Sequence, residues 1–283
     1  MIGPDHLIRV TAHAVVPEQV VAYVWAVSES RPRMVGPCVG YECGGEFVLV
    51  AYPLHDPRDE GGMAEAVEQA LQIPGLRRIT VIGPAKPKAV PAGSRIEEDC
   101  YYAVPVPPPE PAQKLRNLLR RASRELTVER GRHWKDDHLH LVQRYLDERH
   151  LAPGTRHIFE RLPGYLAASP GSLLLSARLA DGRLAALAVG EFASLHTAFF
   201  MFCFRDPQLA PPGSTDLLLS GLLDEAGRRG HGLMNLGLGV NEGIRFFKRK
   251  WGAIDFLPYV QVTWAPSPPA GALLSRLRGL LRR

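Results

Sequence analysis

The segment Asn235 to Ala253, NLGLGVNEGIRFFKRKWGA, concentrates residue types that could do chemistry. Gly237 and Gly239 stand where a predicted strand, Leu233 to Val240, runs into a predicted helix, Asn241 to Trp251. Glycines at such a junction let a ligand approach the backbone. A single Gly-x-Gly is weak evidence for a nucleotide site, but open α/β sheets bind ligands at the carboxyl ends of their strands. We therefore expect the working site to centre on this segment.

Acidic side chains elsewhere are candidates for general-base catalysis. Glu191 lies in AVGEFA, within a strand predicted at Arg183 to Phe192. Apolar surroundings would raise the pKa of an inward-facing carboxyl group and suit it to take a proton from an amine. Strand alternation also allows Glu191 to face solvent, and this alternative is slightly favoured. Asp216 is a second candidate, and Asp255 and Tyr259 could line the same cleft.

Metal chemistry has little support in the sequence. Cys38 and Cys43 are separated by four residues, and no matching Cys/His pair follows, so zinc is not expected. His138 and His140 are two apart on a predicted helix and therefore on different faces. Reduced, structural thiols are the better interpretation, and they fit a cytosolic compartment.

The composition is that of a folded globular protein, with 46% hydrophobic and 22% charged residues in a chain of 283. A net charge of +5 permits an anionic partner, such as a nucleotide, RNA or anionic lipid, without requiring one. The amino-terminal residues do not resemble a signal peptide, and the most apolar stretch, Ala198 to Phe204, is too short to span a bilayer. We expect a cytoplasmic protein.

Proline-rich stretches divide the chain. VPVPPPEP at Val104 to Pro111 is typical of an extended interdomain linker. The expected organisation is an amino-terminal domain at 1–104, a linker at 105–112, a second domain at 113–264, and a proline-rich linker with a basic tail helix at 265–283.

Hydrophobic periodicity predicts alternating helices and strands in both domains. In the first domain these are a helix at Pro17 to Ser28, a hairpin at Cys38 to Leu54, a helix at Gly62 to Gln72, and strands at Arg78 to Ile82 and Asp99 to Val106. In the second they are helices at Gln113 to Arg124, Lys135 to Arg149, His157 to Ala168, Ser214 to Arg229 and Asn241 to Trp251, with strands at Glu125 to Arg130, Ser172 to Leu179, Arg183 to Phe192, Thr197 to Arg205, Leu233 to Val240 and Asp255 to Trp264. Such an order implies a mixed, mostly antiparallel sheet flanked by helices.

That order resembles the GNAT acyltransferase fold. The segment NLGLGVNEGIRFFKRKWGA resembles the carboxyl-terminal portion of the Fem-type and lysyl-phosphatidylglycerol-synthase-type transferases, in particular bacterial proteins of the synthase carboxyl-terminal-domain type. KLRNLLRRASR, at Lys114 to Arg124, resembles the basic helix that opens their second domain. The resemblance covers residues 97–264 and implies two GNAT-like halves in tandem, of which 1–104 is the degenerate one.

The resemblance implies a transferase that moves an acyl or aminoacyl group to an amine or hydroxyl. The donor is acyl-CoA in ordinary GNAT proteins and aminoacyl-tRNA in the Fem and synthase branches, so no tightly bound cofactor is expected. The acceptor would be a small molecule, a lipid or a peptide. The tail, GALLSRLRGLLRR at 271–283, is predicted to be a basic amphipathic helix that could lie on an anionic membrane or dock on protein. A lipid head group as acceptor and a location at the inner membrane face are therefore also expected as alternatives.

The resemblance also implies a role for Lys248. It would polarise the donor carbonyl or hold an anionic group, against the alternative of a solvated basic helix end. The expected catalytic residues are Lys248, Glu191 and Asp216; the expected donor-binding residues are Gly213, Ser214, Thr215, Gly237, Gly239 and Asn241; the expected substrate-binding residues are Asn235, Arg245 and Tyr259.

One loop departs from the GNAT pattern. Ordinary members bind the CoA pyrophosphate on a glycine-rich loop before a helix, whereas this chain has PPGSTD at 211–216. The alternative is an ordinary helix start capped by Ser214 or Thr215. A GNAT-fold binding protein that has lost the donor loop is therefore the rival to an enzyme.

Overall fold

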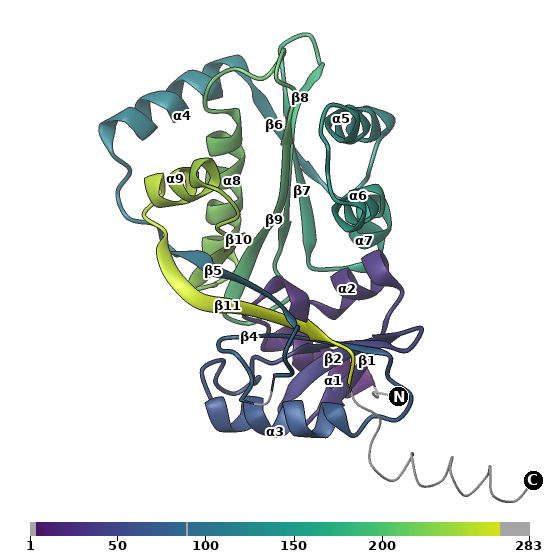
Figure 1. Cartoon of the computed structure of the whole chain (residues 1–283). Helices are drawn as coiled ribbons and strands as arrows, with labels where there is room; N and C mark the ends of the chain where they lie inside the picture. Colours follow the sequence, from purple (N-terminus) through teal and green to yellow (C-terminus); the bar gives the residue numbers. More distant parts are fainter. Residues whose placement is uncertain (1–3, 89, 267–283) are drawn as a thin grey trace, which may run out of the picture. The chain divides into compact units, whose positions relative to one another are not determined.

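The structure, a computed structural model, describes residues 4–88 and 90–266 and contains two compact units (Figure 1). The smaller unit comprises Ser30–Glu98 and residues 258–266. The larger unit comprises Pro4–Glu29 and Asp99–Leu257.

The smaller unit is a five-stranded sheet with one helix packed on its core. Its elements are β1 (Arg31–Val35), β2 (Cys38–Cys43), β3 (Glu46–Val50), α3 (Glu60–Leu71), β4 (Arg78–Gly83) and residues 258–264 of β11 (Ile254–Trp264). Neighbouring strands are antiparallel except β3 and β4, which α3 connects as a parallel pair. Gly44 and Gly45, both with positive φ, form the hairpin turn between β2 and β3, as the sequence predicted.

The larger unit places helices on both faces of a six-stranded sheet in the order β5-β10-β9-β8-β7-β6. Its strands are β5 (Arg95–Pro105, from Asp99 onward), β6 (Thr127–Gly131), β7 (Ser172–Arg178), β8 (Leu184–Glu191), β9 (Thr197–Arg205) and β10 (Leu233–Leu238). Its helices are α1 (Pro4–Ala12), η1 (Pro17–Gln19), α2 (Val21–Ser28), α4 (Gln113–Glu125), α5 (Asp136–Asp147), α6 (Pro153–Glu160), α7 (Leu162–Ala168), α8 (Ser214–Arg228) and α9 (Glu242–Lys250).

The sheet of the larger unit is buried on both faces at its centre. Leu218 and Leu222 of α8 pack on one face together with Ala186 of β8. Leu141 of α5 and Leu162 of α7 belong to the core on the other face. Every residue of β8 is buried as a result, so this strand offers no solvent-facing side.

Both units use the same strand pattern. Three antiparallel strands are followed by a helix and a fourth strand parallel to the third, and a fifth strand pairs antiparallel with the fourth. The fifth strand of the larger unit is β5, which follows β4 in the chain, whereas β11 follows α9 and supplies the fifth strand of the smaller unit. This arrangement is a mixed, mostly antiparallel α/β fold of two GNAT-like halves.

The exchanged strands give unit boundaries that differ from the domains expected at 1–104 and 113–264. Pro4–Glu29 belongs to the larger unit, and residues 258–266 belong to the smaller one. The proline-rich segment at 105–112 lies within the larger unit and not between the two.

Several local expectations need correction. The helix expected at His157 to Ala168 is two helices, α6 and α7, which meet at Arg161 before Pro163. The structure also contains α1 and β1, neither of which was predicted from the sequence. The residue that caps α8 is Gly213, not Ser214 or Thr215.

Candidate functional site

The carboxyl ends of β9 and β10 mark an opening in the sheet of the larger unit. The two strands pair in parallel only over Thr197–Phe199 and Leu233–Asn235, although β9 continues to Arg205 and β10 to Leu238. Where the pairing ends, β9 has a bulge at Met201. Phe200 and Phe202 lie opposite consecutive residues of β8, so Met201 is the extra residue. Bulges of this kind often lie beside active sites. The two strands thus stop pairing past Phe199 and Asn235.

The turn between β10 and α9 is held in an unusual conformation at this opening. Val240, a β-branched residue, has φ 55°, a left-handed conformation that is costly for its side chain. The carboxylate of Asp99 accepts hydrogen bonds from the backbone N–H of Gly239 at 3.2 Å and of Val240 at 2.8 Å. Asn241 caps α9, since its Oδ1 accepts from Ile244 N at 3.0 Å, which confirms the predicted cap. Strain maintained by surrounding contacts is typical of functional turns.

Lys248 is buried beside this turn. The residue is only 4% exposed. Its Nζ donates to the carbonyl oxygen of Leu238 at 2.5 Å and lies 5.5 Å from the ring centroid of Tyr102. Burial lowers the pKa of Lys248 to about 7, and the nearby carboxylate of Asp99 only partly opposes that effect. The alternative of a solvated basic helix end is therefore wrong.

Room for an added side-chain atom lies next to the Lys248 ammonium. Gly237 has φ 79°. Apart from its chain neighbours, the one group within 4 Å of a Cβ added there is the Nζ of Lys248, at 3.8 Å. Gly239 differs, because a Cβ there would be 2.6 Å from Asp99 Oδ1. Gly237 thus leaves room at the end of β10, and Gly239 allows the close approach of Asp99.

Arg245, one turn earlier on α9, adds a second cationic group. Its Nε is buried and has no hydrogen-bond partner among the residues that the structure describes. Buried polar groups are normally paired, so an unpaired guanidinium N–H suits an anionic or carbonyl ligand. The structure therefore brings Gly237, Gly239, Asn241, Arg245 and Lys248 together around one turn.

The start of α8, where GNAT proteins of the ordinary type would bind a pyrophosphate, is filled by protein. A Cβ at Gly213 would lie 2.8 Å from the carbonyl oxygen of Leu118 on α4. Ser214 Oγ donates to Pro211 O at 2.5 Å, and the side chain of Thr215 hydrogen-bonds to the half-buried Cys203. The three residues at the start of α8 that were expected to bind a donor, Gly213, Ser214 and Thr215, thus all have internal contacts.

Glu191 is fully buried, and the favoured solvent-facing interpretation was wrong because β8 is covered on both faces. Its Oε2 accepts from Tyr165 Oη at 2.7 Å and from Ser169 Oγ at 2.5 Å, and its Oε1 accepts from the N–H groups of Phe192 and Ala193, each at 3.0 Å. Four donors saturate the carboxylate, which anchors the end of β8 to α7. Its catalytic role has no support from this geometry.

Asp216 and Asn235 also have internal partners. Asp216 Oδ1 accepts from Trp251 Nε1 at 2.9 Å and from Lys250 Nζ at 2.6 Å, so it joins the start of α8 to the end of α9. Asn235 is fully buried; its Nδ2 donates to Val15 O at 2.8 Å and its Oδ1 accepts from Gly237 N at 2.7 Å. Asp216 therefore helps to position α9, and Asn235 helps to fix the end of β10.

Tyr259 lies in the smaller unit, where its hydroxyl contacts Gln261 Oε1 at 2.7 Å. Sequence reasoning missed Asp99 and Tyr102, which flank Lys248 from β5. An acidic residue directly before CYYAV was a visible signal for Asp99. The place of Tyr102 beside Lys248 depends on the exchange of strands and had no local signal.

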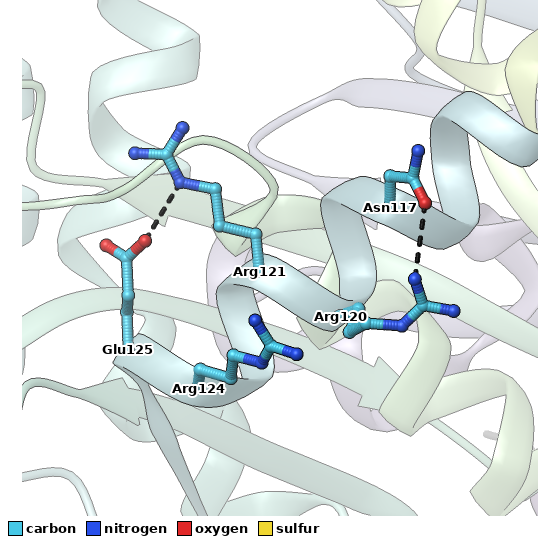
Figure 2. Close-up of a pocket in the computed structure, with 5 residues that line it drawn as sticks. All are labelled: Asn117, Arg120, Arg121, Arg124 and Glu125. Atoms are coloured by element: carbon cyan, nitrogen blue, oxygen red, sulfur yellow. Dashed lines mark hydrogen bonds and ion pairs between the residues drawn. The ribbon is translucent and has the colours of Figure 1, made fainter.

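A basic face on α4 is the second feature with binding potential. Asn117, Arg120, Arg121 and Arg124 line a shallow surface pocket with Glu125 (Figure 2). Within that set Arg121 pairs with Glu125 at 2.9 Å and Arg120 contacts only Asn117, as the dashed lines show. The spacing i, i+3, i+4, i+7 puts these side chains on one face, while the apolar residues of α4 face the core.

The strand order and the divergence of β9 and β10 define a GNAT-like fold. The structure resembles FemX over 94% of this chain and 96% of that chain, with a TM-score of 0.63 and 10% identity. It resembles the C-terminal domain (DUF2156) of a putative lysylphosphatidylglycerol synthetase from Agrobacterium fabrum over 99% of this chain and 97% of that chain, with a TM-score of 0.59 and 17% identity.

A tandem GNAT protein from the clavulanic acid biosynthesis pathway is also similar, at a TM-score of 0.50 and 14% identity over 93% of this chain and 94% of that chain. At such identities the likeness establishes the fold alone. No protein-family model and no curated protein matches the sequence.

In residues 4–88 and 90–266, no helix is long and apolar enough to cross a bilayer. The basic tail expected at 271–283 lies outside the described residues.

Proposed function

We propose that this chain transfers an acyl or aminoacyl group to an amine or hydroxyl acceptor at the opening between β9 and β10. The observation that carries the proposal is Lys248, a buried lysine whose Nζ borders open space at Gly237, at the carboxyl end of β10. The fold, shared with FemX and with the lysylphosphatidylglycerol synthetase domain, supports it.

Lys248 would stabilise the charge that develops on the donor carbonyl. A protonated Nζ can donate to the oxyanion that forms when the acceptor attacks, in a place from which water is largely excluded. Its pKa of about 7 means that the ammonium is partly populated at neutral pH. The Leu238 carbonyl oxygen, 2.5 Å away, aims the side chain at the end of β10.

We propose aminoacyl-tRNA, and not acyl-CoA, as the donor. A Cβ at Gly213 would clash with the Leu118 carbonyl oxygen of α4, so protein crowds the usual pyrophosphate position at the start of α8. The arginine face of α4 offers several cations spaced by about one helical turn, which suits a phosphate backbone. The apolar residues of α4 pack into the core of the larger unit. The arginine face therefore has no apolar side chains to insert into a lipid surface.

The test is a transfer assay on the full chain. Radiolabelled lysyl-tRNA and radiolabelled acetyl-CoA are each offered with phosphatidylglycerol vesicles or a lysine-containing peptide as acceptor. We expect label to leave lysyl-tRNA, and Lys248→Met to reduce the rate by about 100-fold or more. Arg249→Met, the neighbouring exposed cation, is the matched control and should keep most of the activity.

Failure of the wild type with both donors would overturn the proposed function. Full activity in Lys248→Met would overturn the role of that lysine and leave the fold as the only link to transferases.

A binding protein without catalysis is the second candidate, and the saturated contacts of Glu191 and Asp216 favour it. In that case lysyl-tRNA raises the melting temperature of the chain by mass action and no label moves.

A further inference from the structure

The segment that leads into η1 runs along β10 on the face of the sheet opposite α9. The Val15 carbonyl oxygen accepts from Asn235, near the middle of β10. Three residues later, Glu18 Oε2 accepts a hydrogen bond from Tyr101 Oη at 2.8 Å. Tyr101 is paired with Leu238, the last residue of β10. The segment therefore brings a carboxyl group to the same end of β10 that Lys248 contacts.

Tyr101 and Tyr102 of β5 show that Glu18 and Lys248 lie on opposite faces of the sheet. Successive side chains of a strand point to opposite sides of a sheet. Tyr102 lies beside the Lys248 ammonium, whereas Tyr101 reaches Glu18. Glu18 and Lys248 thus flank the carboxyl end of β10 from opposite faces, at the level where β9 no longer pairs with it.

Tyr23 of α2 connects Glu18 to β9, the strand on the other side of the opening from β10. Its ring packs against Phe202 with centroids 5.9 Å apart and joins Phe199 and Met201, all on β9. Burial raises the pKa of the Tyr23 hydroxyl, and the nearby carboxylate of Glu18 raises it further. Glu18 therefore has neighbours from both β5 and α2, the latter packed on β9.

We propose that Glu18 is the proton acceptor of the transfer reaction, taking a proton from the acceptor amine or hydroxyl at the opening between β9 and β10. This inference rests on the proposed function. With an ammonium acceptor, Glu18 takes one proton, and the free amine attacks the ester carbonyl held by Lys248. The C–N bond forms, the C–O ester bond breaks, the second nitrogen proton goes to the leaving ribose oxygen, and Glu18 returns its proton to solvent.

The environment of Glu18 fits this task. Burial raises the pKa of its carboxyl group above the ordinary value, and the Tyr101 hydrogen bond opposes that rise. As a whole, the residue is half-buried. The titratable groups found to interact with it are Tyr101 of β5 and Tyr23 of α2. A base whose pKa is moved toward neutrality is more effective than an exposed carboxylate.

The test compares two acceptors with radiolabelled lysyl-tRNA as donor. Ethanolamine is protonated at neutral pH and needs a base, whereas hydroxylamine is mostly unprotonated and does not. Glu18→Gln is expected to slow transfer to ethanolamine by about 100-fold or more and to change transfer to hydroxylamine little. The amide oxygen of Gln can still accept from Tyr101, so the fold should be kept.

Tyr101→Phe gives an independent readout. It removes a hydrogen bond that lowers the pKa of Glu18, so the acidic limb of the rate profile with ethanolamine should move to higher pH. No loss in Glu18→Gln, or an equal loss with both acceptors, would overturn the inference while leaving the proposed function intact. A wild type that transfers label to neither acceptor would overturn the proposed function itself.

Discussion

The larger unit contains two helix starts that follow a glycine-bearing turn, at α8 and at α9, and they differ in what surrounds them. At α8, Gly213 has φ 92° and faces the Leu118 carbonyl at a distance that leaves no room for a Cβ. At the turn before α9, Gly237 has φ 79° and faces open space bordered by Lys248. A helix start offers its amides to an anion only where it is accessible. The second of the two therefore has the more room beside its glycine.

The first helix start supports the second. Asp216, in the first turn of α8, pairs with Lys250 and Trp251 at the end of α9. Phe247 of α9 also stacks on Phe200 of β9, with centroids 6.4 Å apart. Asp216, which was expected to be catalytic, thus acts on the position of α9 and so on Lys248.

The largest expected effect comes from adding a methyl group at each glycine. Gly213→Ala combines a left-handed backbone with a clash against Leu118 O, and we expect it to lower the free energy of unfolding by about 3 kcal/mol. Gly237→Ala has the same backbone penalty but open space, so about 1 kcal/mol is expected. Urea unfolding of both variants measures the difference.

In the transfer assay the order should reverse. A methyl group at Gly237 enters the space beside Lys248, so Gly237→Ala should slow transfer more than its small loss of stability explains. Equal stability losses in the two variants would show that α4 can move away from Gly213, and the comparison of the two helix starts would then fail.

The second prediction concerns how Lys248 links stability to pH. Its pKa is about 7 in the folded chain against an ordinary 10.5, so between these values the unfolded chain binds more protons and stability rises with pH. Lys248→Met lacks this term. From about pH 6 to about pH 9, we expect the wild type to gain on the order of 2 kcal/mol relative to Lys248→Met.

Urea unfolding at both pH values measures this difference, and Arg249→Met provides the control because that side chain is exposed. The control should follow the wild type at both pH values. Parallel behaviour of wild type and Lys248→Met would mean that the ammonium is solvated, and the distinction between an open and a closed helix start would lose its main support.

Local sequence was sufficient for most elements of the fold. The hairpin at Gly44 and Gly45 and the cap at Asn241 were predicted, because both depend on residues a few positions apart. Strand partners were not, since the hydrophobic pattern of β5 or β11 does not specify which unit it joins. The GNAT-type order could be recognised, while the exchange of fifth strands could not.

The candidate site was predictable only in part. The β10–α9 segment was chosen for its glycines and basic helix, and its residues do lie together. The burial of Lys248 depends on Tyr102 and Asp99, which are distant in sequence, so no local pattern indicated it. The cap of α8 was assigned to a hydroxyl side chain by propensity, whereas close contact with Leu118 requires Gly213.

The smallest expected effect lies in the turn that precedes α9. Val240 is 64% exposed and has φ 55°, so its side chain gains little from packing while the backbone is strained. Val240→Gly removes that strain at the cost of more freedom in the unfolded chain, and we expect a net gain of about 0.5–1 kcal/mol in the free energy of unfolding. Asp99 should still hold the turn, because its hydrogen bond to residue 240 uses the backbone N–H.

If strain in this turn serves to present the end of β10 to a ligand, Val240→Gly should gain stability and lose transfer rate together. Val240→Ala, which keeps a Cβ in the left-handed conformation, is the control and should gain much less stability. A stabilised Val240→Gly with an unchanged rate would show that the conformation of Val240 serves the fold and not the site, and Gly237 with Lys248 would then carry the difference between the two helix starts alone.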